Sequence, residues 1–355
     1  MFAYQISRHG GPEVLEWVEI PTPEPGAHEV LVRVRACALN HLDIWVRRGV
    51  EGHTFPLPIV PGSEISGDIA ALGSEVHDLT VGDATLVAPG LSCELCDRCL
   101  GGKDHLCRKY SILGEDRNGG YAEYVLVPRR NILPHPVGLS YVQSAAFPLV
   151  FLTAWHMLID RAHFMAGEDV LIHAAGSGVS TAAIQIADLV GARKIIVTAS
   201  SQEKLDKALE LGATHTIQYS EEDFVQSTRR ITNKRGVDVV LDHVGGETFE
   251  RSLSALGSGG RLVLCGATTE HLATVNLRAV FFKNLSILGS TMGSLAELIH
   301  LLSFFDQGRL KPVVDRTIAL EEAPKAQLLL ESRKSFGKIV LTVGDDQIAK
   351  KPPHG

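Results

Sequence analysis

The sequence predicts an α/β protein in which a β-rich part comes first and a parallel, doubly wound sheet follows. Over about the first 145 residues, short apolar strand candidates are separated by proline and glycine clusters such as Pro21–Gly26. From Gly167 onward, short apolar runs alternate with amphipathic helical segments, which is typical of a parallel sheet with helices on both faces. With 355 residues, the chain has the length of two domains.

Each expected element follows from its local pattern. The expected strands of the β-rich part are 2–6, 15–20, 30–38, 64–72, 84–87 and 121–128. In the later part, the expected strands are 170–173, 194–198, 214–219, 237–242, 261–265 and 285–288. One helix is expected to follow the first of these strands and to end at Val190, and three more are expected at 202–211, 221–232 and 247–256. The last segment predicts helices at 295–306 and 321–332 and strands at 317–319 and 338–343.

The composition is that of a globular protein and argues against two classes of partner. Lys and Arg number 34 and Asp and Glu 41, so the net charge is −7, which disfavours nucleic acid and anionic membranes. The longest apolar stretch, Ala145–Ile159, is too short and too interrupted to span a bilayer and predicts a buried helix. The first residues lack the pattern of a secretory signal, so we expect a cytoplasmic protein.

A turn of small residues follows the first strand of the later part. The segment His173–Ser180 ends a strand and opens a helix, where backbone N–H groups can approach a pyrophosphate, and Gly176 and Gly178 are expected to supply the necessary backbone freedom. The strict G-x-G-x-x-G pattern is not met, and a plain strand-to-helix turn is the alternative. The strand–turn–helix–strand context favours dinucleotide binding, with Gly176, Ser177, Gly178 and Val179 at the cofactor.

The end of the next strand bears on the choice of cofactor. Ala199 stands where an acidic residue would hold the ribose 2′-hydroxyl of NAD. Ser200, Ser201 and Lys204 offer hydrogen bonds and a charge for a 2′-phosphate, so we expect NADPH in preference to NADH. The alternative, which does not exclude the first, is that the two serines cap the helix that starts at Gln202.

Four of the six cysteines, Cys93, Cys96, Cys99 and Cys107, crowd into one short segment. Four thiolates at this spacing can close a tetrahedral zinc site with no open position, so the site would be structural. One structural Zn per chain is therefore predicted. An iron–sulfur cluster satisfies the same ligand count and is the weaker alternative.

The motifs together resemble the medium-chain dehydrogenase/reductase superfamily over nearly the whole chain. They are Gly62–Glu64 with Gly67, Leu72–Ser74, Val81–Asp83, the cysteine segment, Gly119–Tyr124, Thr153–Ala154, Ala175–Ser180, Leu211–Ala213 and Gly337–Lys338. The resemblance implies a GroES-like catalytic domain over 1–150 with a zinc lobe at about 90–110 and a Rossmann dinucleotide-binding domain over 151–290. It further implies that 291–345 returns to the catalytic domain and that 346–355 is a flexible tail.

The chain departs from the zinc alcohol dehydrogenases where they hold a catalytic zinc. The resemblance places Asn40 at the cysteine ligand, Ser63 at the histidine ligand and Leu149 near the third ligand. Because an amide and a hydroxyl are poor zinc ligands and leucine is none, we expect no catalytic zinc. His41, Asp43 and Glu64, which are near one another in the sequence, are the alternative ligands for a metal site.

The missing metal favours the branch of quinone and alkenal reductases, which reduce an activated C=C bond. Conjugation makes the β-carbon electrophilic, so NADPH can deliver hydride if the carbonyl oxygen is stabilised as an enolate. Asn40, His41 and Ser63 are the candidate catalytic residues. Asn40 is expected to donate a hydrogen bond to the enolate, while His41 either donates a proton or faces the cofactor phosphates.

The resemblance implies further cofactor contacts and an oligomer. These contacts are Thr153, Val244, Gly266, Ala267, Ser290, Thr291, Met292 and, at the phosphates, Lys338. The apolar strand 285–288 resembles the edge through which family members pair, so we expect a homodimer or a dimer of dimers.

Two other functions remain open from the sequence. One is an alcohol or aldehyde dehydrogenase with an atypical or absent catalytic zinc, and the other is a non-catalytic, cofactor-binding protein. The substrate itself is expected to be a small unsaturated carbonyl compound or quinone.

Overall fold

The computed structural model describes residues 1–344, apart from the side chain of Glu247. The chain divides into two compact units. The first unit contains Met1–Leu149 and resumes at Ser294, and the second contains Val150–Gly293. The tail predicted at 346–355 lies outside the described residues.

The second unit is built on a parallel, six-stranded sheet. Its strands are β10 (Asp169–Ile172), β11 (Lys194–Ala199), β12 (His215–Gln218), β13 (Val237–Asp242), β14 (Leu256–Leu264) and β15 (Ser286–Gly289). They lie in the order β12-β11-β10-β13-β14-β15. The order reverses between β10 and β13, and this switch point is where such sheets bind ligands.

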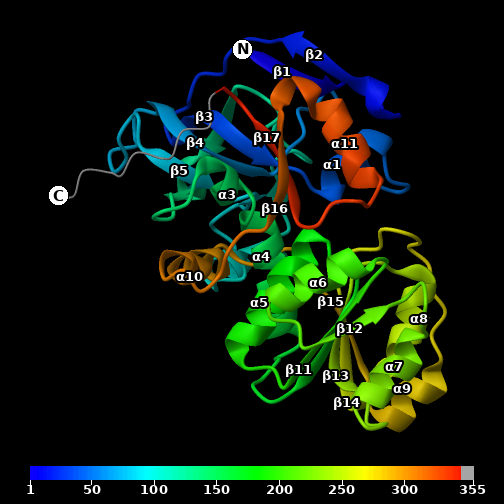
Figure 1. The fold of residues 1–355 in the computed structure, drawn as a ribbon. Coiled ribbons are helices and arrows are strands. Elements are labelled where there is room, and N and C mark those ends of the chain that lie inside the picture. Colours follow the sequence, from blue (N-terminus) through cyan, green and yellow to red (C-terminus); the bar gives the residue numbers. More distant parts are fainter. Residues whose placement is uncertain (345–355) are drawn as a thin grey trace. The chain divides into compact units, whose positions relative to one another are not determined.

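Helices cover both faces of this sheet. They are α4 (Pro148–Trp155), which begins in the first unit, the π-helical turn η4 (His156–Arg161), α5 (Gly178–Val190), α6 (Gln202–Glu210), α7 (Phe224–Ile231), α8 (Gly246–Ala255) and α9 (Leu277–Lys283). Figure 1 shows α5 and α6 on one face and α7, α8 and α9 on the other. All four residues of β10 are buried, as expected of a central strand covered on both sides.

The first unit is mainly antiparallel. Its main sheet is formed by β16 (Val314–Ala319), β17 (Lys338–Thr342), β3 (Glu29–Ala38), β4 (Glu64–Leu72), β5 (Ala84–Val87) and β9 (Ile132–Pro134) in that order, with β8 (Tyr124–Pro128) also paired to β3. Strand β17, near the end of the chain, pairs with β3, near its beginning, and Leu341 lies opposite Cys37 (Figure 1). The segment that resumes at Ser294 is therefore part of the core of this unit.

Smaller elements complete the first unit. They are β1 (Phe2–Ile6), η1 (Pro12–Val14), β2 (Leu15–Glu19), α1 (His41–Arg48), β6 (Gly90–Leu91), α2 (Asp97–Leu100), η2 (Asp104–Leu106), β7 (Ser111–Ile112), η3 (Arg129–Asn131), α3 (Tyr141–Ala145), α10 (Leu295–Asp306), η5 (Leu320–Glu322) and α11 (Ala323–Glu331). Among the described residues 1–344, no helix combines the length and apolarity that a bilayer crossing requires.

Most of the predicted strands are confirmed. Two helices were not predicted, and one predicted strand begins later than expected. Helix α1 was not predicted, although Asn40 and Asp43 form a capping box at its start. Helix α9 was also missed, although the Asn276 side chain caps it and Asn284 ends it in the left-handed region. Residues 121–123, predicted as strand, form a loop in which the Tyr121 N–H donates to the Pro61 carbonyl oxygen.

A fully buried arginine ties the two parts of the first unit together. Arg47 of α1 donates to Gln327 at 2.8 Å and to Glu331 at 2.5 Å, and both partners lie on α11. Arg48 also pairs with Glu331 at 2.8 Å, but its side chain is 60% exposed. Because removing one member of a buried pair leaves an uncompensated charge, Arg47 is the more important of these two arginines.

Replacing Arg47 by Met should therefore lower the free energy of unfolding by about 3 kcal/mol, since Gln327 and Glu331 both lose their buried donor and only the exposed Arg48 still pairs with Glu331. Arg48→Met is the matched control and should cost less than about 1 kcal/mol, because exposed pairs contribute little. Urea unfolding of both variants measures the difference. Equal losses would mean that burial does not set the strength of this link.

Candidate functional site

The carboxyl ends of the parallel strands bring most of the predicted cofactor residues to one edge of the second unit. Each group directly follows a strand of the sheet. They are Gly176, Ser177, Gly178 and Val179 after β10, Ser200 and Ser201 after β11, Val244 after β13, Gly266 and Ala267 after β14, and Ser290, Thr291 and Met292 after β15. Lys204 lies on α6 beside this edge, and Thr153 is buried within α4. Dinucleotides bind at this edge of such sheets.

The turn after β10 is shaped differently from the sequence prediction. Ala174, rather than Gly176 or Gly178, takes the left-handed conformation with a φ of +50°. The chain reverses at Ala174 because its carbonyl oxygen accepts from the Ser177 N–H at 2.8 Å. The two glycines were expected to supply backbone freedom, but neither of them takes a positive φ. The turn still presents the N-terminus of α5, which favours an anion.

The end of β11 carries no carboxylate. Ala199 is buried, Ser200 is exposed, and Ser201 occupies the N-cap position of α6. The Ser201 hydroxyl makes no capping hydrogen bond, so the capping alternative is not realised for this side chain. The hydroxyls of Ser200 and Ser201 and the ammonium group of Lys204 are donors of the kind that a 2′-phosphate needs.

Three polar side chains form a buried group in the first unit, around the start of α1. The Lys338 ammonium group donates to the Leu39 carbonyl oxygen at 2.5 Å and to Asn40 Oδ1 at 2.7 Å, and it pairs with Glu64 at 2.6 Å. Asn40 Nδ2 donates to the same Glu64 oxygen at 3.1 Å, with a longer contact of 3.5 Å to the Ala38 carbonyl oxygen. The other Glu64 oxygen accepts from the Leu149 N–H at 2.7 Å.

This arrangement changes how two predicted residues are interpreted. All three N–H groups of Lys338 are used by protein acceptors, so in this structure the side chain has no donor left for a cofactor phosphate. The Asn40 amide likewise directs its N–H groups to Glu64 and Ala38. Asn40 and Lys338 therefore stabilise the start of α1 against Glu64. A hydrogen bond from Asn40 to an enolate would have to replace its 3.5 Å contact with the Ala38 carbonyl oxygen.

Asp43 is a second buried acceptor beside this group. Its carboxylate accepts from the Asn40 N–H at 2.8 Å, the Gly62 N–H at 3.1 Å and the Tyr121 hydroxyl at 3.1 Å. Burial raises the pKa of Asp43 to about 6, although these donors and Lys338 act in the opposite direction. The carboxylate thus connects the start of α1 to the Gly62 loop and fixes where Ser63 lies.

Ser63, next to Gly62, has a fully buried hydroxyl that makes no hydrogen bond to the described residues. A buried hydroxyl without a partner is costly, so it is a natural donor to a ligand. Asn40, Ser63 and Leu149 provide no thiolate or imidazole, and an ammonium group already neutralises Glu64. These residues therefore do not fit a catalytic zinc ion.

His41, the first residue of α1, stays neutral at neutral pH. Burial lowers its pKa to about 4, and the nearby positive charges of Arg333 and Lys338 act in the same direction. A neutral imidazole is a poor proton donor, whereas an anion among these cationic groups would be stabilised. The electrostatics therefore favour the phosphate-facing role of His41 over the proton-donor role.

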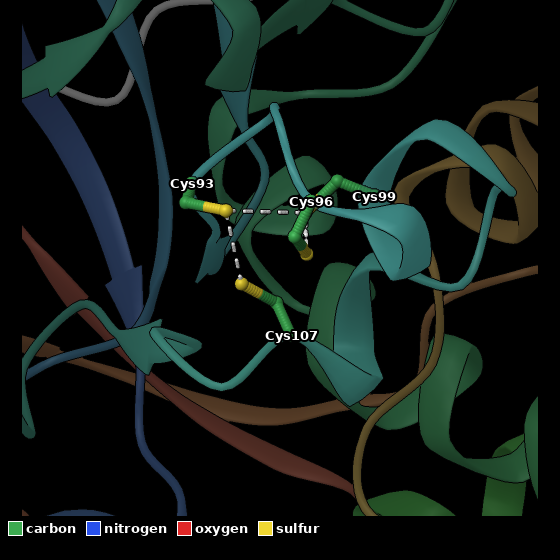
Figure 2. A group of neighbouring side chains, drawn as sticks. All are labelled: Cys93, Cys96, Cys99 and Cys107. Carbon is green, nitrogen blue, oxygen red and sulfur yellow. Dashed lines mark hydrogen bonds between the residues drawn. The ribbon is translucent and has the colours of Figure 1, made fainter.

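The four clustered cysteines point toward one another, as Figure 2 shows. The Sγ atoms of Cys93 and Cys107 are 3.5 Å apart, those of Cys96 and Cys99 3.5 Å, and those of Cys93 and Cys99 3.9 Å. Four thiolates bound to one zinc at about 2.3 Å would have their sulfurs about 3.8 Å apart. The cluster therefore fits a closed, structural zinc site.

Neighbouring groups support this zinc lobe. The Lys109 N–H donates to Cys107 Sγ at 3.3 Å, and the Ser92 hydroxyl lies 3.4 Å from Cys99 Sγ. Arg130 donates to the same Ser92 hydroxyl at 2.8 Å, which fixes its position. The backbone N–H groups of Leu95 and Cys96 lower the pKa of Cys93 to about 6, which favours the thiolate that binds metal.

Comparison with known proteins agrees with this fold. The family model for the alcohol dehydrogenase GroES-like domain matches residues 26–137, and that for zinc-binding dehydrogenase matches 178–307. An NAD-dependent alcohol dehydrogenase of Sulfurisphaera tokodaii is 33% identical over 96% of this chain and 99% of its own. A quinone oxidoreductase of Pseudomonas aeruginosa is 32% identical over 95% of this chain and 98% of its own.

A solved structure is also similar. The crystal structure of an NAD-dependent alcohol dehydrogenase has a TM-score of 0.93 and 49% identity, covering 97% of this chain and 100% of that one. The fold and the site thus define an NAD(P)-dependent oxidoreductase. The chain belongs to the medium-chain dehydrogenase/reductase superfamily.

Metal analysis by mass spectrometry should find one zinc per chain. Cys107→Ser should remove the ion and lower the melting temperature by about 5 °C, because the lobe loses its cross-link. Cys265→Ala, outside the cluster, is the control and should retain the zinc. Two zinc ions per chain would contradict the absence of a catalytic metal, and none would contradict the structural site.

Proposed function

We propose that this protein reduces an activated C=C bond of an enone, enal or quinone with NADPH and without a catalytic metal. The observation that carries the proposal is the buried group at the start of α1. The resemblance puts Asn40, Ser63 and Leu149 at the places where zinc-dependent members would hold their ion. In this structure Lys338 pairs with Glu64 and Asn40, and the Ser63 hydroxyl has no partner within the described residues.

The residues suit a reaction in which negative charge develops on one oxygen. NADPH, when bound, would supply hydride to the β-carbon of the substrate, and the electron pair of the C=C bond would move to the carbonyl oxygen to give an enolate. The Ser63 hydroxyl donates a hydrogen bond to that oxygen, which stabilises it as charge develops. Asn40 and Asp43 keep Ser63 in place, and a solvent proton at the α-carbon completes the saturated product.

The names of the relatives favour a second candidate function as well. Two of the three relatives described above are named alcohol dehydrogenases, and one is named quinone oxidoreductase. An alcohol dehydrogenase needs a group that stabilises an alkoxide, a role that zinc plays in metal-dependent members. Because the donor set at Asn40 and Ser63 does not fit zinc, the reduction of a conjugated substrate is the better-supported function.

The cofactor is inferred from the end of β11. Ala199 leaves no carboxylate to repel a 2′-phosphate, and Ser200, Ser201 and Lys204 provide donors for it. Two of the relatives are named NAD-dependent, so NADH is the alternative. The positive charges of Arg333 and Lys338 beside the neutral His41 suit the cofactor phosphates.

A homodimer is the proposed assembly. Strand β15 is the outermost strand of its sheet, and one of its edges is unpaired in the part of the chain that the structure describes. Leu277, Phe281 and Phe282 on α9 are 72%, 63% and 71% exposed, which is unusual for such large apolar side chains. Antiparallel pairing of two β15 strands would extend the sheet across two copies and cover part of this surface.

Following NADPH loss with an enone, a quinone and a simple aldehyde tests the reaction. Turnover is expected with the enone or the quinone, and Ser63→Ala should lower kcat by about 100-fold because one donor to the enolate is lost. Ser66→Ala is the matched control, since the hydroxyl of this buried serine on β4 already donates to the Thr85 carbonyl oxygen, at 3.2 Å. Turnover of the aldehyde alone would favour the alcohol dehydrogenase function.

The same protein tests the cofactor preference. Lys204→Ala should raise the Kd for NADPH by about tenfold and leave that for NADH nearly unchanged, because only NADPH carries the 2′-phosphate. Lys207→Ala, on the same helix and paired with Glu203 at 2.7 Å, is the control. Equal losses for the two cofactors would place the 2′-phosphate elsewhere.

A further inference from the structure

A buried histidine lies directly beneath the dinucleotide turn of the second unit. His173 follows β10 and is 2% exposed. Its ring nitrogen Nδ1 lies 3.1 Å from Thr198 Oγ1 on β11, and Nε2 lies 2.9 Å from Ser252 Oγ on α8. One imidazole ring therefore joins the turn after β10 to strand β11 and helix α8.

The donors and acceptors around the ring define its protonation state. Ser252 Oγ donates toward the Thr248 carbonyl oxygen at 2.7 Å and Asp242 Oδ2 at 3.2 Å, so it accepts from His173 Nε2–H. Thr198 Oγ1 accepts from the Ala174 N–H at 3.3 Å and can donate its own proton to Nδ1. The contacts are consistent with a neutral ring protonated at Nε2.

These bonds continue into the loop after β13. This loop lies on the other side of the switch point between β10 and β13, which we call the crevice. On the β13 side, Asp242 Oδ1 accepts from the Val244 N–H at 2.8 Å and the Gly245 N–H at 3.1 Å. The bond from His173 to Ser252 therefore leads directly to the loop that contains Val244, one of the predicted cofactor contacts.

A second path closes the network into a ring. His243 Nε2 lies 2.7 Å from Ser177 Oγ, which donates to Ser180 Oγ at 2.9 Å. Ser180 Oγ donates to the His173 carbonyl oxygen at 2.6 Å. Since His243 adjoins Asp242, the hydrogen bonds start at His173, cross to the β13 loop and return through the N-cap of α5.

We propose that His173 is a positioning residue of the cofactor site, which holds the turn after β10 and the loop after β13 at the separation that the dinucleotide needs. The inference rests on the second unit binding the cofactor, and it does not depend on the identity of the substrate. A preformed crevice avoids the cost of ordering both loops on binding, so His173 acts on cofactor affinity.

The surroundings of the ring keep it neutral. Burial lowers the pKa of His173, and the charge of Arg251 lowers it further, whereas Asp242 raises it. The Phe224 ring packs edge-on against the imidazole at a centroid distance of 4.9 Å, which excludes water from this side. A neutral imidazole matches the donor at Nε2 and the acceptor at Nδ1 that the two hydroxyls require.

Variants of His173 separate the two bonds. His173→Phe removes both and should raise the Kd for the cofactor about tenfold or more, with a smaller change in kcat at saturating cofactor. The Gln side chain can reproduce the donor at Nε2, and the Asn side chain can reproduce the acceptor at Nδ1. Because only the Nε2 bond crosses the crevice, His173→Gln should restore most of the affinity and His173→Asn should not.

Two further variants keep the proposal testable if His173→Phe does not fold. Ser252→Ala removes the bond across the crevice from the other side and should weaken cofactor binding to a similar extent. Combining it with His173→Asn, which also lacks the Nε2 bond, should cause little further loss, because both changes break the same bond. Additive losses would contradict the proposed link.

A matched control distinguishes positioning from general stability. Thr232 is a buried threonine of the same unit whose hydroxyl donates to the Thr228 carbonyl oxygen at 2.8 Å and accepts from the Gly236 N–H at 3.0 Å. It precedes β13, at the opposite end of the strand from the crevice. Thr232→Val should lower the melting temperature without changing cofactor affinity.

Fluorescence titration with NADPH and NADH measures these affinities without any substrate. The proposal is overturned if His173→Phe and Thr232→Val change the Kd equally, or if the wild-type protein binds neither cofactor. Nitrogen NMR of the histidines should show His173 as the neutral Nε2–H tautomer at neutral pH. A ring protonated at Nδ1 would also overturn it. A failure to reduce unsaturated carbonyls, in contrast, would affect only the proposed substrate.

Discussion

A buried ion pair between Lys338 and Glu64 holds the candidate site of the first unit together. Burying two charges is costly unless hydrogen bonds satisfy their remaining groups, and here Asn40, the Leu39 carbonyl oxygen and the Leu149 N–H complete the set. The pair therefore joins the first residue of β17 to the first residue of β4, and its hydrogen bonds reach Leu39 and Asn40, which follow β3. Because the group is internally satisfied, the Ser63 hydroxyl is the polar side-chain atom of this site that has no partner within the described residues.

The two units rely on the same physical device for different purposes. Each has a buried polar side chain that connects separate segments of the unit, Asp43 in the first unit and His173 in the second. Buried polar networks cost stability if any member is unsatisfied, but complete ones specify a single geometry. In both units, a side chain that is buried from solvent thus fixes the positions of the segments that it connects.

The sequence allowed much of the fold to be predicted, because most strands are short apolar runs between glycines and prolines. The predicted ranges for β4 and β13 agree with the structure residue for residue. Helix α1 was hidden because Asn40 and Asp43 were interpreted as chemistry rather than as a cap. The bond between Lys338 and Asn40 could not be foreseen, since the two residues lie 298 positions apart. The role of His173 was missed because its side-chain partners, Thr198 and Ser252, lie on other elements of the fold.

The pairing of β17 with β3 has a consequence for the order in which the protein can assemble. The main sheet of the first unit is completed only by residues at the far end of the chain, while the whole second unit is inserted between its two parts. A growing polypeptide therefore exposes the nested Rossmann sheet in full before the last strand of the surrounding sheet has been synthesised. Until then, the edge of β3 is open to pairing with other chains, and this period is when the nascent protein is most exposed to aggregation.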